Sequence, residues 1–359
     1  MKSILKVTAI NAAVLLALLL VVELFLGNWI RPMSIGDLKR FSIPINVKFS
    51  YDVSSLYGPP GVPREIQYTR DEWGLRGDFT QLADIDLLTI GGSTTDQKFI
   101  DDGETWQAFT QAELAARGKR VTIANAGVDG QSTTGHLFDF DNWFNLLPDL
   151  KPRTILFYAG INDVMKTTAR GQFDGSLDAD NWRVKSATWQ LVRLVRGSIN
   201  ARNAQVVHGR KATYTDADFS TEGLLDAATR ERVAAEVSAG FLRDVDALVR
   251  RTRALGAQPV FVTQNAYGWN AGAGPARGIR GQIVRAHGHE MNYADVSFVH
   301  QHLNAALLRH CAETGLTCFD MAGEIALGAE DYYDFLHASP SGAKKIGAYL
   351  AEKLAATQP

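Results

Sequence analysis

The sequence predicts an α/β domain in which helices cover both faces of a five-stranded parallel sheet, preceded by one N-terminal transmembrane helix. From residue 86 onward, short apolar runs alternate with longer helical patterns, as in parallel sheets whose strands are buried on both faces. The 359 residues are 46% hydrophobic and 21% charged, a globular composition with a sizeable core. An apolar run over residues 7–26 has the length of a membrane span.

The apolar run at residues 7–26 contains only three polar residues, Thr8, Asn11 and Glu23. About 20 residues at ~1.5 Å each cross a hydrocarbon core of ~30 Å. We expect a retained anchor, residues 1–29, rather than a cleaved signal peptide, because no small-x-small exit follows the run. Basic residues flank it on both sides, so the charge count does not fix the orientation. Because large domains after a first span usually translocate, we expect a single-pass protein of the cytoplasmic (inner) membrane, facing the periplasm or cell exterior.

Residues 30–80 contain scattered proline and glycine and little helical periodicity. We expect a linker there that ends in a hairpin-like lead-in at residues 66–77. Gly74 fits a turn that needs a positive φ.

The alternating elements belong to the domain expected over residues 81–359. Its strands are expected at residues 86–90, 121–124, 154–158, 259–263 and 316–319. The doubly wound pattern favours a flavodoxin-like strand order, 2-1-3-4-5. A long helix ending at Leu255 carries an apolar stripe at three-to-four spacing, formed by Val233, Val237, Phe241, Val245 and Leu248. Two stretches without the alternation, at about 165–225 and 266–290, follow strand ends, so we expect insertions that form walls or a lid over the site.

Polar motifs stand at the carboxyl ends of these strands, where open α/β sheets bind ligands. They are Gly91-Gly92-Ser93, Asn125-Ala126-Gly127, Gly160-Ile161-Asn162-Asp163 and, before the last helix, Asp334-Phe335-Leu336-His337. Each is a weak signal alone, and the ordered set in one chain is a strong one.

Together these motifs contain the groups that acyl transfer requires. Ser93 needs an imidazole within hydrogen-bonding reach to take its proton, and His337 supplies one. Asp334, three residues earlier, can fold back to the other imidazole nitrogen. The backbone N–H groups of Ser93 and Gly127 and the side-chain amide of Asn162 are candidate donors to an oxyanion. The chain has no G-x-S-x-G motif, so the nucleophile elbow of α/β-hydrolases is absent.

The ordered motifs resemble the SGNH hydrolases, or GDSL-type esterases, over roughly residues 85–165 and 315–355. The resemblance implies the same roles: the serine as nucleophile, the aspartate and histidine as acid and base, and the glycine and asparagine in the oxyanion hole. In one departure, Gly92 stands where the family's Gly-Asp-Ser motif has aspartate. That aspartate is not a catalytic group, so activity is compatible with glycine, but the local hydrogen bonding must differ.

The anchor, the lead-in at residues 73–77 and the Gly-Gly-Ser-Thr-Thr motif resemble the membrane-anchored bacterial branch of that family. Members of the branch are often linked to acyl groups on surface polysaccharides. The resemblance therefore implies an esterase acting on carbohydrate O-acyl esters, above all O-acetyl esters, through an acyl-serine intermediate and without a cofactor. The alternatives are a lipid or thioester acyl hydrolase at the membrane surface, and a catalytically silent module that binds glycan or serves as a scaffold. The chain has 37 basic and 39 acidic side chains, so its charge is nearly balanced and no nucleic-acid partner is expected. The sequence identifies no protein partner.

Two other carboxylates are alternatives for the triad acid. Asp163 directly follows Asn162, and capping or holding the loop is the simpler role for it. Asp331 is less well spaced from the histidine.

Paired histidines raise the question of a metal site. His300 and His302 lie in an expected helix over residues 292–311, where positions i and i+2 diverge. Neither they nor His287 and His289 have carboxylates at a recognised spacing, so we expect no metal.

Two further features stay open. Cys311 and Cys318 bracket a helix end and the next strand, and an oxidising compartment would allow a disulfide between them. Trp182, Trp189 and Trp269 either stack on sugar rings or belong to the local core.

Overall fold

The computed structural model describes residues 2–30, 32–59, 61–166, 182–193, 195 and 214–357. Much of the insertion expected at about 165–225 lies outside the described residues. The chain forms two units, which are described separately: residues 1–43 with 176–207, and residues 44–175 with 208–359.

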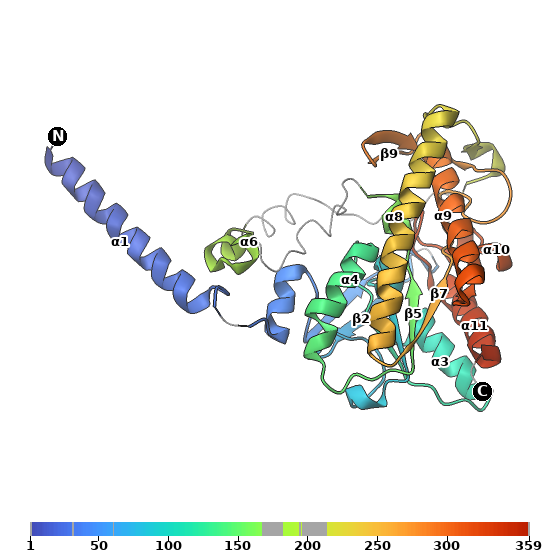
Figure 1. Cartoon of the computed structure of the whole chain (residues 1–359), viewed down its shortest axis with the longest axis horizontal. Coiled ribbons are helices and arrows are strands. Elements are labelled where there is room, and N and C mark those ends of the chain that lie inside the picture. The colour runs from blue at the N-terminus through green and yellow to red at the C-terminus, as the bar shows by residue number, and fades with distance from the viewer. Residues whose placement is uncertain are drawn as a thin grey trace. The chain divides into compact units, whose positions relative to one another are not determined.

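A five-stranded parallel sheet forms the centre of the larger unit (Figure 1). Its spatial order is β4 (Ile123–Asn125), β3 (Leu87–Gly91), β5 (Thr154–Tyr158), β7 (Gln258–Val262) and β11 (Thr317–Phe319). In chain order this is 2-1-3-4-5, so the predicted topology is confirmed. The two central strands β3 and β5 are buried along their whole length, because helices cover both faces of the sheet.

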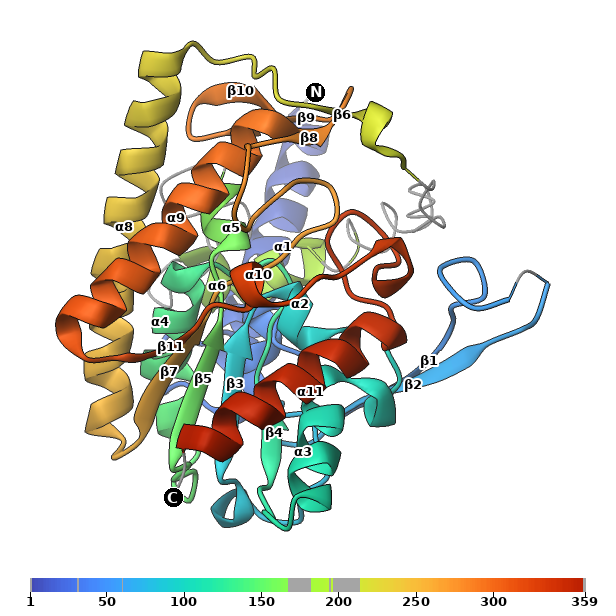
Figure 2. The same cartoon turned by 90° about the vertical axis from the view of Figure 1, so that its right-hand side faces the viewer.

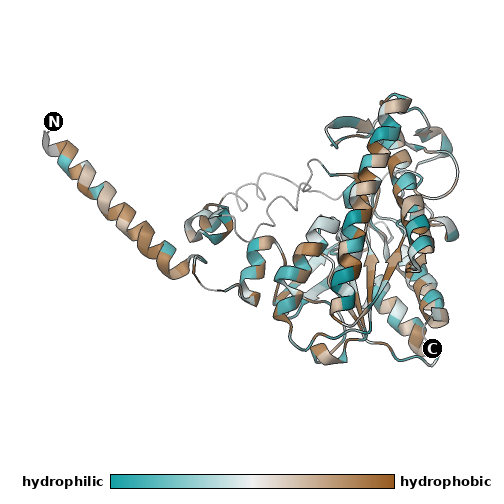
Figure 3. Cartoon of the chain, in the orientation of Figure 1, coloured by the Kyte–Doolittle hydropathy of each residue, from teal (hydrophilic) through white to brown (hydrophobic). Residues whose placement is uncertain are grey.

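Helices form a layer on each side of the sheet (Figure 2). On one face lie α3 (Trp106–Ala116) and α11 (Pro340–Thr357), and on the other lie α4 (Thr133–Asn142), α8 (Ala227–Ala254) and α9 (Tyr293–Thr314). The predicted apolar stripe of α8 is buried, and Figure 3 shows hydrophilic residues interspersed along this helix. The αβα sandwich expected from the sequence is therefore present.

Shorter elements complete the described part of the larger unit. The helices are α2 (Ser93–Asp96), α5 (Ile161–Val164) and α10 (Met321–Glu324), and the strands outside the central sheet are β1 (Val47–Asp52), β2 (Glu65–Arg70), β6 (Phe219–Ser220), β8 (Gly278–Ile279), β9 (Ile283–Ala286) and β10 (His289–Asn292). Single 3-10 turns lie at Leu82–Asp84, Asp102–Glu104, Phe144–Leu146, Asp216–Asp218 and Ala329–Asp331. A disulfide joins Cys311 in α9 to Cys318 in β11.

Residues 47–70, expected as part of a linker, contain an antiparallel hairpin of β1 and β2. The side chains of β2 alternate between solvent and the protein interior, and Ile66, Tyr68 and Arg70 are buried. Farther along, Arg76 forms an antiparallel bridge with Asn125 in β4, the edge strand of the central sheet. The lead-in is thus built into the domain and covers part of that edge.

The smaller unit contains the N-terminal helix α1 (Lys2–Leu26), a 3-10 helix at Ile35–Phe41 and α6 (Trp182–Lys185). Residues Ile4–Leu26 are long and apolar enough to cross a membrane, and Figure 3 shows hydrophobic residues along most of this helix. A helix of this kind is either a membrane anchor or a signal sequence.

Candidate active site

Ser93 is the first residue of the one-turn helix α2, which directly follows β3. The strand end places its side chain at the carboxyl edge of the sheet. The Ser93 Oγ lies 2.8 Å from Nε2 of His337. Because the first N–H groups of a helix lack intrahelical acceptors, the Ser93 N–H is suited to bind an anion.

His337 lies in the loop before α11, and its ring is oriented by Asp334. The Nδ1 atom is 2.7 Å from Oδ2 of Asp334. The other carboxylate oxygen accepts backbone hydrogen bonds from Leu336 at 2.8 Å and from His337 at 2.7 Å. Ser93, His337 and Asp334 therefore form one hydrogen-bonded chain.

The electrostatics of this chain favour a charged pair after proton transfer. Burial raises the pKa of Asp334, but the hydrogen bonds from His337 and Leu336 outweigh it and bring the pKa below its usual value. Burial lowers the pKa of His337, but the hydrogen bond with Asp334 and the negative charges of Asp334, Asp129 and Asp96 raise it above its usual value. A more basic imidazole is a better acceptor of the serine proton.

Tyr333 supports the imidazole from its face. Its ring stacks on that of His337 with centroids 5.5 Å apart and an interplanar angle of 9°. Behind it, the rings of Tyr57 and Phe99 lie 6.1 and 6.4 Å from that of Tyr333. Tyr333 was not among the residues predicted from the sequence, although an aromatic residue directly before Asp334 was a visible signal.

Asn162 and Gly127 come from the two strands that flank β3. The Nδ2 atom of Asn162 donates to the carbonyl oxygen of Gln131 at 2.8 Å; an amide nitrogen has a second hydrogen, which remains for a bound ester. Gly127 lies against α2, since a Cβ there would be 2.4 Å from the backbone nitrogen of Asp96. Its own N–H donates to Oδ1 of Asn125 at 2.8 Å. The Gly127 N–H is thus engaged within its own loop, and its role in an oxyanion hole stays a prediction.

The glycine at position 92 has a packing reason. A Cβ built on Gly92 would lie 2.2 Å from Nδ2 of Asn162 and 3.1 Å from the carbonyl oxygen of Gln131. The space that an aspartate side chain would enter is therefore filled by the amide of Asn162.

Gln264, after β7, links the two helices that begin at this edge of the sheet. Its Nε2 donates to Oγ1 of Thr94 in α2 at 3.0 Å and to the carbonyl oxygen of Tyr158 at 3.1 Å. Its Oε1 accepts from the backbone N–H of Ile161 in α5 at 2.8 Å. This buried residue was not predicted from the sequence, where its only signal was an amide close to the end of an apolar strand.

Arg70 of the lead-in forms an ion pair with the last residue of α2. Its guanidinium is buried and lies 2.6 Å from the carboxylate of Asp96, the last residue of α2. Tyr68 donates to the same carboxylate oxygen at 3.0 Å, and Arg70 also donates to the carbonyl oxygen of Gly127. The hairpin thereby connects the loops that contain the nucleophile and Gly127.

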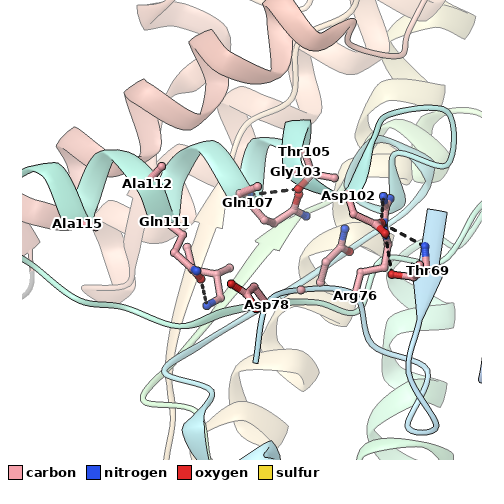
Figure 4. Close-up of a pocket in the computed structure, with 14 residues that line it drawn as sticks. Thr69, Arg76, Asp78, Asp102, Gly103, Thr105, Gln107, Gln111, Ala112 and Ala115 are labelled. Carbon is pink, nitrogen blue, oxygen red and sulfur yellow. Dashed lines mark hydrogen bonds and ion pairs between the residues drawn. The ribbon is translucent and has the colours of Figure 1, made fainter. Parts of the chain in front are cut away.

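Arg76, like Arg70, forms an ion pair with an aspartate, and this pair lies beside a cavity of about 450 Å³. Its Nη2 lies 2.6 Å from the carboxylate of Asp102, which also accepts from Oγ1 of Thr69 at 2.6 Å (Figure 4). The cavity is lined by these residues, by Gln107 and by neighbouring parts of α3. Ser93 and His337 do not line it, so we assign the chemistry to the triad edge of the sheet and not to this cavity.

The two alternative carboxylates have other partners. Asp163 accepts from Oγ1 of Thr133 at 2.6 Å and pairs with Lys166 at 3.0 Å, so it fastens the segment after β5. Asp331 pairs with Lys345 at 2.6 Å. Neither is the carboxylate that meets the imidazole Nδ1.

Five of the histidines and tryptophans singled out in the sequence have structural contacts. Trp269 is 2% exposed and donates to Nδ1 of buried His300 at 3.0 Å, which places Trp269 in the core. His287 contacts two backbone carbonyl oxygens of α5 at 3.0 Å. Trp182 and Trp189 pack on each other, with ring centroids 5.4 Å apart, in the smaller unit. Within the described ranges, no group of three or more His, Cys, Asp or Glu side chains is arranged to hold a metal ion.

The comparisons with known proteins concern the same part of the chain. A model of the GDSL-like lipase/acylhydrolase family matches residues 89–345. Among curated proteins, none matches the sequence. Solved structures that match include a member of the lipolytic protein G-D-S-L family from Veillonella parvula, at 13% identity over 76% of this chain and all of that chain (100%), with a TM-score of 0.40. A catalytic mutant of an acetylxylan esterase from Geobacillus stearothermophilus matches at 16% identity over 74% of this chain and 93% of that chain, also with a TM-score of 0.40.

Proposed function

The chain belongs to the GDSL-like lipase/acylhydrolase family, and on that premise we propose that it is a membrane-anchored serine esterase that removes acyl groups, above all acetyl groups, from carbohydrate or polysaccharide esters. The observation that carries the proposal is the hydrogen-bonded chain from Ser93 Oγ to His337 at 2.8 Å and on to Asp334 at 2.7 Å. A serine, a base and an orienting acid in this order are the parts of a nucleophilic acyl transfer.

In the acylation step, Ser93 Oγ forms a bond to the ester carbonyl carbon while its proton passes to Nε2 of His337. The negative charge on the carbonyl oxygen is stabilised by the Asn162 amide and the Ser93 N–H. When the bond to the alcohol oxygen breaks, the imidazolium returns its proton to that oxygen. The alcohol leaves and the acyl group stays on the serine.

In the deacylation step, the same imidazole accepts a proton from water as the water attacks the acyl-serine. The tetrahedral intermediate collapses, the proton returns to Ser93 Oγ, and the carboxylic acid is released. Asp334 keeps the imidazole in one tautomer and stabilises its positive charge in both steps. No cofactor enters this sequence.

Half-buried aromatic rings beside the catalytic loop support a carbohydrate substrate. The ring of Tyr214 lies 6.0 Å from that of Tyr267 and 6.2 Å from that of Phe335. Phe335 follows Asp334 directly, and its carbonyl oxygen accepts from the N–H of Tyr267 at 2.9 Å. Aromatic faces provide the flat apolar surface on which sugar rings stack, and tyrosine adds a hydroxyl.

Two features support a location on the outer side of the cytoplasmic membrane. The helix at Ile4–Leu26 has the length and composition of an anchor. The disulfide between Cys311 and Cys318 is of a kind that persists in the periplasm or outside the cell and is rare in the cytosol.

The proposal is tested by a substrate panel with the full-length protein in detergent micelles. We expect acetate release from an O-acetylated polysaccharide, slower hydrolysis of long-chain phospholipid esters, and little hydrolysis of acyl thioesters. The Tyr214→Ala variant should raise KM for the polysaccharide and leave hydrolysis of p-nitrophenyl acetate unchanged. A preference for phospholipids or thioesters would replace the carbohydrate substrate with the membrane-surface alternative. A folded protein that hydrolyses none of these esters would contradict an esterase function.

A further inference from the structure

Glu23 lies in the last turn of the apolar helix α1, where a carboxylate is costly unless it is hydrogen-bonded. Its Oε1 accepts from the Ser186 hydroxyl at 2.7 Å and from the N–H of Thr188 at 2.9 Å. Its Oε2 accepts from the N–H of Ala187 at 3.1 Å and from the indole of Trp29 at 2.9 Å. Residues 187–193 are helical, so Glu23 caps the start of a second helical segment more than 160 residues away in the chain.

Further hydrogen bonds tie the same segment to the end of α1. The N–H of Asn28 donates to the carbonyl oxygen of Lys185 at 2.8 Å. Arg40 donates to the carbonyl oxygen of Val184 at 2.9 Å and to that of Leu26 at 3.2 Å. Figure 1 shows α6 beside the C-terminal end of α1. The end of the apolar helix is therefore part of a folded body that includes residues 182–193.

This body has a large exposed apolar surface. Outside α1, the exposed large apolar side chains are Trp29 at 45%, Ile30 at 91%, Trp182 at 54%, Leu191 at 62%, Val192 at 40% and Val195 at 51%. Phe25 and Leu26 at the end of α1 are also exposed. Residues 182–193 contain three basic residues, Arg183, Lys185 and Arg193, and no acidic residue.

Each of these properties matches the interface of a lipid bilayer. Tryptophan concentrates at headgroup level, short helical segments with apolar and basic side chains lie in the interface plane, and anionic headgroups attract lysine and arginine. Because the segment is fastened to the end of the expected span, it lies at the depth where that interface begins.

We propose that residues 182–193 form a second membrane contact, which Glu23 holds in the headgroup region of a leaflet that contains anionic phospholipid. The proposal rests on the membrane anchoring proposed above and is independent of ester hydrolysis. The proposal also requires that α1 is retained rather than cleaved, because removal of residues 1–26 would leave the N–H groups of Ala187 and Thr188 without their acceptor.

The depth of this segment can be measured in the full-length protein. The only two cysteines form the disulfide, so a thiol introduced by Leu191→Cys can be labelled alone with an environment-sensitive nitrobenzoxadiazole dye. In vesicles of phosphatidylcholine and phosphatidylglycerol, lipids spin-labelled near the headgroup should quench the emission, as for a group in the interface. The same dye at Arg250→Cys, an exposed position on α8, is the control and should not be quenched.

The Glu23→Ala variant tests the role of the cap, with Glu23→Gln as a milder change that keeps one acceptor oxygen. In Glu23→Ala, quenching at residue 191 should be lost, while hydrolysis of p-nitrophenyl acetate and membrane retention after alkaline carbonate extraction are unchanged. Full quenching at residue 191 in both variants would remove the role given to Glu23. Equal quenching in vesicles of phosphatidylcholine alone would contradict the role given to the basic residues.

Two failures are distinguishable. An anchored protein whose residue 191 is not quenched would overturn the second membrane contact and leave the anchor in place. A mature N-terminus beyond residue 26, measured by mass spectrometry, would contradict the anchor as well. Neither result bears on the triad.

Discussion

The side-chain amide of Asn162 lies directly in front of Gly92, so close that a Cβ at residue 92 would be 2.2 Å from its nitrogen. The turn that presents the nucleophile and the helix that presents the asparagine are therefore packed on each other. At position 92 this chain replaces the family's aspartate with the one residue that leaves room for this contact.

Restoring the aspartate should therefore be harmful. In Gly92→Asp, the Asn162 amide must move away from a bound ester, and we expect kcat on p-nitrophenyl acetate to fall by roughly 10²–10³, as when an oxyanion donor is lost. Gly240→Ala is the matched control, because a Cβ there meets only the Arg243 side chain at 3.6 Å. A Gly92→Asp variant with unchanged kcat would show that the position of Asn162 does not matter.

Asn162 should act on turnover rather than on binding. Because its donor meets charge that develops in the transition state, Asn162→Ala should lower kcat by about 10²–10³, or ~3–4 kcal/mol, with KM near normal. Asp163→Ala should instead lower the melting temperature, since Asp163 pairs with Lys166 and accepts from Thr133. Full turnover in Asn162→Ala, together with loss of turnover but not of stability in Asp163→Ala, would reverse the two roles.

The pH dependence should report His337. The imidazole must be neutral to accept the serine proton, so kcat/KM should rise with pH through its pKa. The interaction with Asp334 raises that pKa, so the rise is expected above the usual value of about 6.5. Asp334→Asn removes the charge, so it should move the rise to lower pH and reduce the plateau, with the fold intact by circular dichroism. A rise that stays at the same pH in Asp334→Asn would exclude His337 as the titrating group.

Gln264 should position the site without touching the substrate. Gln264→Leu removes the hydrogen bonds to Thr94 and Ile161, and we expect kcat to fall by roughly 10–10² because small misplacements at a reacting centre are costly. Orphaned buried groups should lower the free energy of unfolding by about 1–3 kcal/mol. Gln264→Glu keeps an acceptor for the Ile161 N–H but no donor to Thr94, so it separates the two contacts. A lower melting temperature with unchanged kcat would make Gln264 merely structural.

The sequence predicted the site because parallel strands bring their carboxyl ends to one edge. Ser93 and Asn162 follow neighbouring strands, and the Asp-x-x-His spacing places an acid next to its imidazole. The Arg70–Asp96 pair was not predictable in this way, because an isolated contact between two distant polar residues has no periodic signature.

The hairpin at residues 47–70 did have a signal. Its strands read VKFSYD and EIQYTR, which alternate between apolar and polar residues as half-buried strands do. The prolines and glycines between them dominate the local composition and obscure this pattern. The contacts of Glu23 were not predictable either, because three of its four hydrogen-bond donors belong to residues 186–188, a segment that has no sequence relation to the anchor.

The central claim, that Ser93 is the nucleophile of an acyl transfer, is tested most directly by labelling with a serine-directed fluorophosphonate. The full-length protein should bind one probe molecule, and peptide mass spectrometry should place it on Ser93. Ser93→Ala should not label and should lose about 10⁴–10⁶ in kcat, whereas Ser341→Ala should label normally. Labelling that persists in Ser93→Ala, or a folded wild-type protein that hydrolyses esters without labelling at Ser93, would contradict the account.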